Sequence, residues 1–387
     1  MRAVVCENAT LTVEERPEPV PGRGQVRVEV IRCGICGSDL HARHGFDAWA
    51  DMAEELGYDR FGRTTQPVVM GHEFCGRVAE YGPKTKHSVP EGTPVVALPM
   101  LRGKTGGVDL TGLSLDAPGG YADELLVEQS LMLAVPNGLD PEVATLTEPM
   151  AVAYHAVKRG EVGKGQVAVV VGCGPVGLGV ILMLKALGVK TVVASDLSES
   201  RRALATRCGA DVVLDPAVES PYTARAKDHL VTVPAALELA VGALEQMSKL
   251  PVHWSHVWRA ADKVGLTNPK HPVIFECVGA PGIIQDILAG APMFSRIVVV
   301  GVCVGEDRLT PAIAINKELD LRFVFGYTPL EFRDTLHLLA DGKVDPRPLI
   351  TGTVGLDGVE DAFDALSSEP THAKVLVDPK ATAATLA

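Results

Sequence analysis

The sequence predicts an α/β protein of two domains: a β-rich first part followed by a doubly wound parallel sheet. Three observations support this fold class. The chain has 387 residues, which is more than one hydrophobic core usually supports. Residues 1–147 contain short alternating stretches such as QVRVEVIRCGIC, separated by turn clusters such as PEPVPGRG. From residue 149 onwards, apolar strand-like runs alternate with helical segments, which is typical of a parallel sheet.

The second part contains about six expected strands. A buried strand (167–172), a glycine turn, a helix (about 175–187) and a second strand (191–196) follow one another. The other strand-like runs are 210–215, 273–279, 296–303 and 321–327. From about 328 the sequence returns to a mixed character, so we expect the chain to rejoin its first domain. The expected domains are therefore 1–148 with 328–387, and 149–327.

Two stretches resemble insertions and together hold all three tryptophans. The first, 44–67, contains Phe46, Trp49 and Met52, which either line a substrate entrance or pack the insertion onto the domain. The second, about 218–272, is expected to be helical and either covers a cleft or extends a subunit interface.

Composition excludes several classes of partner. A net charge of −12 argues against nucleic acid and against docking on anionic membranes, since both require clustered Lys and Arg. No apolar run is long enough to span a bilayer, and the N-terminus lacks the pattern of a signal peptide. Eight scattered cysteines fit a reducing compartment, so a cytoplasmic location is expected.

The stretch VGCGPVG predicts a dinucleotide site. Gly172, Gly174 and Gly177 have the G-x-G-x-x-G spacing, between an expected strand and an expected helix. Asp196 ends the next strand, where a carboxylate binds ribose hydroxyls and repels a 2′-phosphate. This favours NAD, although Arg201 could still contact a 2′-phosphate. The alternative is a packing turn in a sheet protein that binds no nucleotide.

Candidate metal ligands occur in three separate segments. Cys36 lies in CGICGSDLH, His72 and Glu73 lie in MGHEFCG, and Glu148 precedes a proline at a helix start. Cys33 and Cys36 form a C-x-x-C, but no second C-x-x-C or H-x₃₋₅-H follows, which disfavours a structural zinc finger. A redox pair is also disfavoured, because no matching strand–motif–helix unit surrounds the two thiols.

Taken together, CGICGSDLH, GHEFCGRV, EPMAVAYHA and the glycine turn resemble the zinc-dependent medium-chain alcohol dehydrogenases. The resemblance covers nearly the whole chain, and it is strongest to the polyol, butanediol and threonine dehydrogenase branch. It implies a GroES-like β-barrel catalytic domain plus a Rossmann domain, with the active site in the cleft between them. It also implies a small-molecule alcohol or carbonyl substrate and a homodimer or homotetramer.

The resemblance implies roles for the candidate ligands. Cys36, His72 and Glu148 are expected to bind one catalytic zinc, with Glu73 as an exchangeable or neighbouring ligand. Asp39 is expected to orient the histidine. Many relatives carry a second, structural zinc in a lobe with four cysteines. The corresponding stretch LPMLRGKTGGVDLTGLSLDAPGG has none, so no structural zinc is expected.

The resemblance also implies the cofactor contacts and a proton path. Val176 is expected behind the nicotinamide, Arg201 near the adenosine ribose, and the backbone around Val302 at the carboxamide. Ser38 and His41 are expected to relay the alcohol proton to solvent, the alternative being a turn cap and a surface residue. The complete expected cofactor set is Gly172, Gly174, Pro175, Val176, Gly177, Asp196, Arg201 and Val302.

The expected function is a zinc-dependent oxidoreductase that transfers hydride between a secondary alcohol, polyol or related hydroxy compound and NAD. Three alternatives remain. A zinc-free quinone or enoyl reductase would not need Cys36, His72 and Glu148. A non-enzymatic dinucleotide-binding protein would bind NADH without turnover. A metallohydrolase would leave the glycine turn and Asp196 without a purpose.

Overall fold

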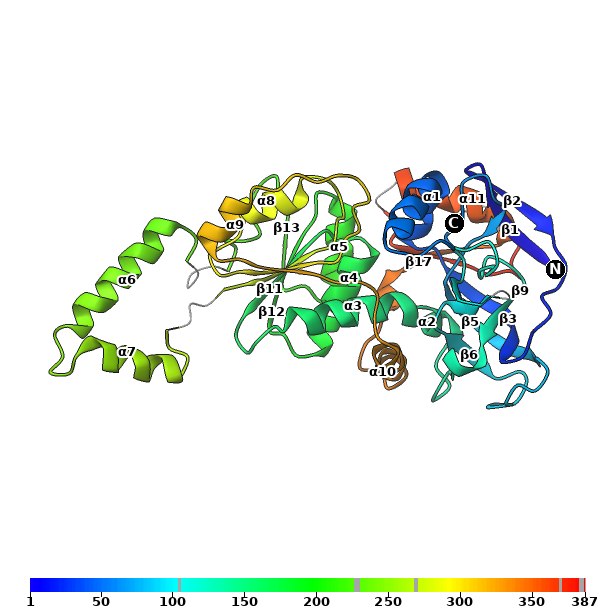
Figure 1. Cartoon of the computed structure of the whole chain (residues 1–387), viewed down its shortest axis with the longest axis horizontal. Coiled ribbons are helices and arrows are strands. Elements are labelled where there is room, and N and C mark those ends of the chain that lie inside the picture. Colours follow the sequence, from blue (N-terminus) through cyan, green and yellow to red (C-terminus); the bar gives the residue numbers. More distant parts are fainter. Residues whose placement is uncertain (104–105, 226–229, 268–270, 369–370, 383–385, 387) are drawn as a thin grey trace. The chain divides into compact units, whose positions relative to one another are not determined.

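The computed structural model describes residues 1–103, 106–225, 230–267, 271–368, 371–382 and 386. The chain divides into two compact units (Figure 1). Unit 1 comprises residues 1–155 and 326–387, and unit 2 comprises residues 156–325. None of the helices in the described ranges combines the length and the apolar character that a bilayer crossing requires.

Unit 1 is built mainly on antiparallel strands. Its principal sheet has the order β10-β6-β5-β3-β18-β17, with β9 also paired to β3. Two smaller sheets have the orders β2-β1-β4 and β7-β8. The strands are β1 (Arg2–Glu7), β2 (Thr10–Glu15), β3 (Gln25–Gly34), β4 (Val68–Val69), β5 (Glu73–Tyr81), β6 (Pro94–Ala97), β7 (Met100–Arg102), β8 (Val108–Leu110), β9 (Glu124–Glu128), β10 (Met132–Ala134), β17 (Ile350–Val354) and β18 (Lys374–Val377).

Strand β3 connects the two chain segments of unit 1. Its alternating Val26, Val28 and Val30 are buried in the core, as period-two patterning requires. At its C-terminal end, β3 pairs antiparallel with β18, aligning Gly34 with Leu376 and Cys33 with Val377. The C-terminal segment therefore completes the sheet that the N-terminal segment begins.

The helices that start in unit 1 include one that covers the first half of the first expected insertion. Helix α1 (Gly37–Glu55) buries Phe46, Ala50 and Ala53, so this stretch is part of the core. The other helices and 3₁₀ turns are α2 (Pro141–Thr145), α3 (Thr147–Gly160), α10 (Pro329–Ala340), α11 (Val359–Ser368), η1 (Gln129–Leu131), η2 (Arg347–Leu349) and η3 (Leu356–Gly358).

Unit 2 contains the predicted parallel sheet, which confirms the α/β fold class. Its six strands have the order β13-β12-β11-β14-β15-β16, and every neighbouring pair is parallel. The strands are β11 (Val167–Val171), β12 (Thr191–Ser195), β13 (Val212–Leu214), β14 (Val273–Glu276), β15 (Arg296–Val299) and β16 (Asp320–Phe323). The helices are α4 (Pro175–Ala186), α5 (Glu199–Arg207), α6 (Val233–Met247), α7 (Trp254–Lys263), α8 (Ile283–Gly290) and α9 (Pro311–Lys317).

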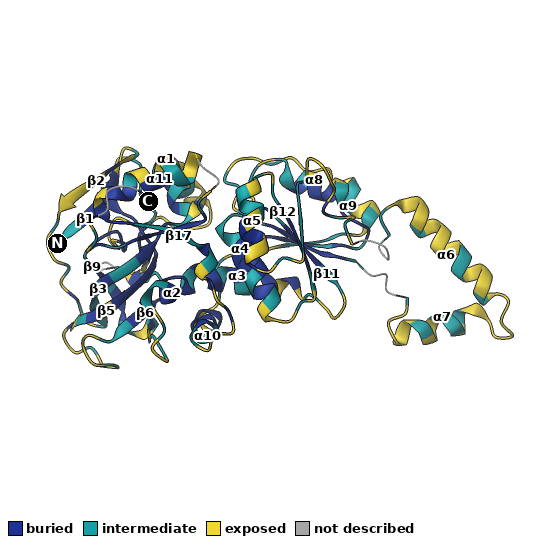
Figure 2. Cartoon of the chain, turned by 180° about the vertical axis from the view of Figure 1, so that it is seen from behind, coloured by how far each residue is buried: buried dark blue, intermediate teal, exposed yellow. Residues whose placement is uncertain are grey.

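The second expected insertion contains the helical hairpin of α6 and α7, as its sequence predicts. Neither helix contains a buried residue, whereas α4 buries most of its length (Figure 2). Residues 226–229 and 268–270 of this insertion lie outside the described residues.

Candidate functional site

Three potential metal ligands meet in unit 1. Cys36 lies just before α1 and adopts an extended backbone, while His72 and Glu73 lie at the start of β5. One ligand atom from each of these residues lies within 4.8 Å of the other two. His72 and Glu73 are buried, and Cys36 is partly exposed.

His72 is oriented by a buried carboxylate. Its Nδ1 lies 3.3 Å from Oδ1 of Asp39, which is fully buried on the first turn of α1. The other oxygen, Oδ2, accepts hydrogen bonds from the Tyr121 hydroxyl at 2.6 Å and from the Cys36 amide at 3.0 Å. Asp39 therefore fixes the imidazole and the Cys36 backbone together.

The pKa values of this pair reflect its mutual attraction. Burial opposes the charge on each group. For Asp39, the His72 charge and the hydrogen bonds outweigh burial, so its pKa is lowered. For His72, the Asp39 charge and hydrogen bonds with Asp39 and Cys36 outweigh burial and raise its pKa well above the ordinary value.

Glu73 is paired with a buried lysine. Both carboxylate oxygens accept hydrogen bonds from Nζ of Lys374, at 2.7 and 2.8 Å, and the lysine also donates to the Ile35 carbonyl at 2.9 Å. Both side chains are buried, at 1% and 0% exposure, so neither charge can be satisfied by water. A Cβ atom at Gly34 would overlap the Glu73 carboxylate, which explains the glycine at the end of β3.

Glu148 lies near this group but outside its 4.8 Å limit. It is in the first turn of α3, and its pKa is raised to about 7. Burial is the main cause and the negative charge of Glu73 adds to it, while the charges of His72 and Lys374 and a hydrogen bond with Tyr327 act in the opposite direction. The structure therefore places all four expected ligands in one electrostatic neighbourhood, with Glu148 farthest from the group.

The two residues of the expected proton relay occupy different environments. Ser38 is partly exposed, and its Oγ lies 3.4 Å from Nε2 of His72. Beside it, Trp49 and Phe61 stack at 5.9 Å and line a small cavity with Ser38. His41 lies one turn farther along α1 and is exposed.

Three residues of this neighbourhood were not identified from the sequence. Lys374, Tyr121 and Tyr327 hold Glu73, Asp39 and Glu148 respectively. Only Lys374 had a detectable signal, because a lysine between apolar strand residues in AKVLVDP is unusual for a buried strand.

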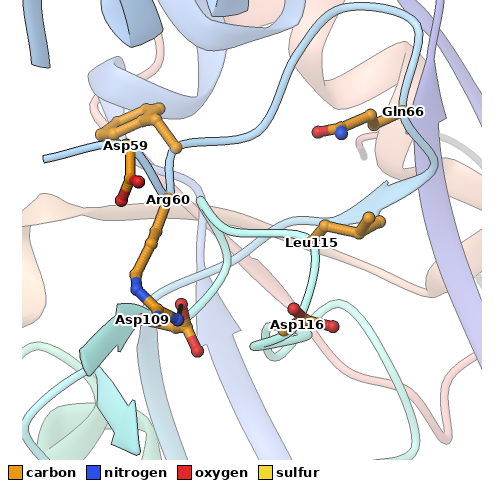
Figure 3. A pocket seen from close by; sticks show the side chains of 7 residues that line it. Asp59, Arg60, Gln66, Asp109, Leu115 and Asp116 are labelled. Atoms are coloured by element: carbon orange, nitrogen blue, oxygen red, sulfur yellow. Dashed lines mark hydrogen bonds and ion pairs between the residues drawn. The ribbon is translucent and has the colours of Figure 1, made fainter. Parts of the chain in front are cut away.

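A separate pocket of about 180 Å³ lies elsewhere in unit 1, and none of the ligand residues lines it. In Figure 3, Arg60 points toward Asp109, and the two form an ion pair at 3.0 Å. Asp109 is almost fully buried, on β8. Arg60 comes from the first expected insertion and lies so close to Gly107 that a Cβ atom there would come within 2.8 Å of its Nε. The pocket is therefore part of the packing between this insertion and the β7–β8 hairpin.

The glycine turn of unit 2 has the geometry that its spacing predicts. Gly172 follows β11 with φ +90°, a conformation that favours glycine. A Cβ atom at Gly177 would overlap the Gly172 carbonyl, so the third glycine allows α4 to approach the strand. Gly174 precedes α4, and the space around its Cα is open. Backbone amides at such a helix start can bind phosphate.

Asp196 is held beside this turn. Its Oδ2 accepts a hydrogen bond from the Cys173 amide at 2.7 Å, and its Oδ1 accepts one from the Ser198 amide at 2.8 Å. A carboxylate has about four acceptor positions, so further donors can still be bound. Arg201 lies on the next helix, and its buried Nε has no hydrogen-bond partner among the described residues.

The remaining expected cofactor residues lie at the edges of the same region. Pro175 and Val176 form the first turn of α4 and are partly exposed. Val302 follows β15, is 49% exposed, and lies so close to Gly279 that a Cβ atom there would come within 2.6 Å of its amide.

The family models of two protein domains match this chain. Residues 22–137 match "Alcohol dehydrogenase GroES-like domain", and residues 175–341 match "Zinc-binding dehydrogenase". Together these ranges cover well over half of the sequence and include Cys36, His72, Glu73 and the second half of the glycine turn.

Curated relatives and solved structures agree with these matches. The (R,R)-butanediol dehydrogenase of Bacillus subtilis is 29% identical over 95% of this chain and 96% of its own length. The L-threonine 3-dehydrogenase of Rhizobium rhizogenes is 25% identical over 95% of each chain. The crystal structure of the 2R,3R-butanediol dehydrogenase of Bacillus subtilis superposes with a TM-score of 0.73 at 28% identity, covering 98% of this chain and 99% of that chain. The chain belongs to the zinc-dependent medium-chain alcohol dehydrogenase family.

Proposed function

We propose that this protein oxidises a secondary alcohol, polyol or related hydroxy compound with NAD, using one zinc ion. The observation that carries the proposal is the group of Cys36, His72 and Glu73, within 4.8 Å of one another and backed by Asp39. Such a group has no role in a zinc-free reductase or in a protein that only binds a dinucleotide.

The donor set fits zinc. A thiolate, an imidazole and a carboxylate are typical zinc ligands, and a catalytic site uses three of them and keeps a fourth position open. With Nδ1 of His72 directed at Asp39, Nε2 is the nitrogen that would bind a metal, in place of its 3.4 Å contact with the Ser38 hydroxyl. Because Lys374 occupies both oxygens of Glu73, we infer that Cys36, His72 and Glu148 would hold the ion and that Glu73 would be an exchangeable neighbour. When bound, zinc supplies Lewis-acid stabilisation of negative charge on the substrate oxygen.

The chain's own side chains would carry the alcohol proton to solvent and would set the charge around the substrate. Ser38, with Oγ 3.4 Å from Nε2 of His72, would accept the proton of the alcohol as it releases its own hydroxyl proton toward His41. The exposed His41 would pass this proton to solvent. Lys374 would hold Glu73 in place and offset its charge, which limits the negative charge that the site presents to the substrate.

The nicotinamide cofactor is proposed to be NAD. Gly172, Gly174 and Gly177 would let the backbone approach the pyrophosphate. Asp196, already fixed by two backbone amides, would accept hydrogen bonds from the ribose hydroxyls and repel a 2′-phosphate.

A homodimer, or a homotetramer built from it, is proposed on the basis of the sheet edge. β16 is the outer strand of the unit 2 sheet; its last residue, Phe323, is 63% exposed, and Phe325 just after it is 92% exposed. Apolar residues on an open strand edge favour pairing with a second copy.

A cytoplasmic location is proposed because all eight cysteines are unpaired.

A metal analysis combined with a cofactor assay tests the proposal. The purified chain is dialysed and its zinc content measured. Absorbance at 340 nm is then followed with NAD or NADP against secondary alcohols, polyols and hydroxy acids. We expect about one zinc per chain and turnover with NAD. Binding of NADH without zinc and without turnover would contradict the proposal.

A further inference from the structure

The α6–α7 hairpin carries an apolar seam that the described residues of its own chain leave uncovered. Val233, Leu237, Ala240, Leu244 and Met247 follow one another at alternating spacings of four and three residues on the 15-residue α6. This is the spacing of a helix that packs against other helices. Yet Leu237 is 62% exposed and Leu244 is 39% exposed, and Figure 2 shows α6 and α7 in the colours of exposed and intermediate residues.

The area of this exposed surface is the size of a protein interface. Leu239, Val241, Leu250, Val252, Trp254 and Leu266 are also between 41% and 79% exposed. At these fractions, the apolar residues of 233–266 together expose on the order of 900 Å², spread over more than one face of the hairpin, whereas each partner buries about 800 Å² in a standard interface.

The charges of the hairpin suit a second copy of itself. Within residues 230–267, Glu238, Glu245 and Asp262 balance Lys249, Arg259 and Lys263, whereas the whole chain has a net charge of −12. Two copies therefore meet less net repulsion at this hairpin than the charge of the whole chain would give. Both glutamates lie on α6, and Arg259 and Lys263 lie on α7, so an antiparallel pair of hairpins brings opposite charges together.

We propose that the α6–α7 hairpins of two copies of this chain pack as a four-helix bundle, forming a self-association interface separate from the β16 edge. Two helices of 15 and 10 residues joined by a six-residue connection are the unit from which such bundles are built. The interface would be isologous: α6 of one copy faces α7 of the other in both directions. The hairpin then provides an assembly contact that does not involve the proposed zinc or NAD residues.

Sedimentation velocity of the full chain at micromolar concentration tests this interface. In the variant Leu237→Glu with Leu244→Glu, the mass of the assembly should fall to half of the wild-type value. The matched control is Leu197→Glu, which changes a residue of unit 2 that is 73% exposed but outside the hairpin, and should keep the wild-type mass. A wild-type mass in the double variant would overturn the proposal, as would binding of the wild-type chain to phosphatidylcholine vesicles with no change of mass in the variant.

Reversing the charges on α6 in one variant and on α7 in another tests whether the hairpin binds a second copy of the chain or a different partner. The variants Glu238→Lys with Glu245→Lys, and Arg259→Glu with Lys263→Glu, should each lose half of the assembly mass. The first variant has basic residues at these positions on both helices, and the second has acidic ones. Because the two surfaces are of opposite charge, an equimolar mixture should regain the wild-type mass. If each variant alone keeps that mass, or if the mixture stays at half, the proposed pairing is wrong. Far-UV circular dichroism and NADH binding, which should match wild type, show that the variants are folded.

Discussion

The ligand group of unit 1 and the glycine turn of unit 2 are polar sites built in opposite ways. The glycine turn and its carboxylate lie within residues 172–201, and backbone geometry does most of the positioning. The ligand group combines side chains from residues 36–39, 72–73, 148, 327 and 374, several of them fully buried and charged. A local site depends on close backbone approach, whereas an assembled site depends on the balance of buried charges.

The largest expected effect is a loss of turnover without a loss of NADH binding when a ligand of unit 1 is replaced. Cys36→Ser should lower kcat/KM by at least about 1000-fold, or roughly 4 kcal/mol of transition-state stabilisation, because a zinc ligand is lost. NADH affinity, measured by fluorescence titration, should stay unchanged because the nucleotide residues are in unit 2. The control is Cys33→Ala, which removes the other thiol of the C-x-x-C and should keep its zinc. Equal zinc loss in both variants would contradict the assignment of Cys36.

The next effect concerns stability and the buried pair of Lys374 and Glu73. Lys374→Met leaves Glu73 buried without a counter-charge, so the free energy of unfolding in urea should fall by about 3 kcal/mol. Adding Glu73→Gln should recover part of this loss. The comparison in unit 2 is Lys185→Met, which removes a partly exposed pair with Asp211 and should cost less than about 1 kcal/mol. Similar losses of unfolding free energy in Lys374→Met and Lys185→Met would show that the buried ion pair contributes no more to stability than the partly exposed one.

A smaller effect is expected from pH, at the segment that positions Tyr327. Burial alone would raise the pKa of Glu331, but hydrogen bonds from Thr328 and the interaction with His155 lower it to about 2. A carboxyl whose pKa is depressed on folding stabilises the protein above its unfolded pKa of about 4.5, and this contribution is lost as pH falls toward 2.

Urea unfolding of wild type and Glu331→Gln at pH 6 and pH 3 measures this contribution. The wild type should be more stable than the variant by about 2 kcal/mol at pH 6, after allowance for solvent screening, and the difference should narrow at pH 3. A difference that does not change with pH would show that Glu331 has an ordinary pKa.

The smallest expected effect concerns cofactor choice. Asp196→Asn keeps an acceptor beside the glycine turn but removes the charge that repels a 2′-phosphate. The preference for NAD over NADP, measured as the ratio of kcat/KM values, should fall about tenfold, or roughly 1.4 kcal/mol. Zinc content should remain that of the wild type. An unchanged preference would show that Asp196 only holds the Cys173 and Ser198 amides.

The sequence predicted most of the unit 2 sheet because its signals are local. The apolar run at β11, the glycines after it and the carboxylate after β12 follow one another within about thirty residues. Residues that are close in the sequence are therefore also close in the structure here. The helical character of the second insertion was likewise predicted, and α6 and α7 confirm it. The sequence does not decide the role of the first insertion, and its three apolar residues differ: Phe46 is buried, Trp49 stacks on Phe61 and lines the small cavity with Ser38, and Met52 is 36% exposed.

The sequence by itself predicted the fold class and the glycine turn, because periodicity and motif spacing are properties of neighbouring residues, whereas the candidate ligands were proposed from the resemblance of separate motifs to a known family. Only the tertiary structure placed Lys374 against Glu73, Tyr121 against Asp39 and Tyr327 near Glu148. These partners come from strands and loops up to three hundred residues away, and no local pattern records them. They are required because a charge removed from water must find its counter-charge or its hydrogen bonds within the protein.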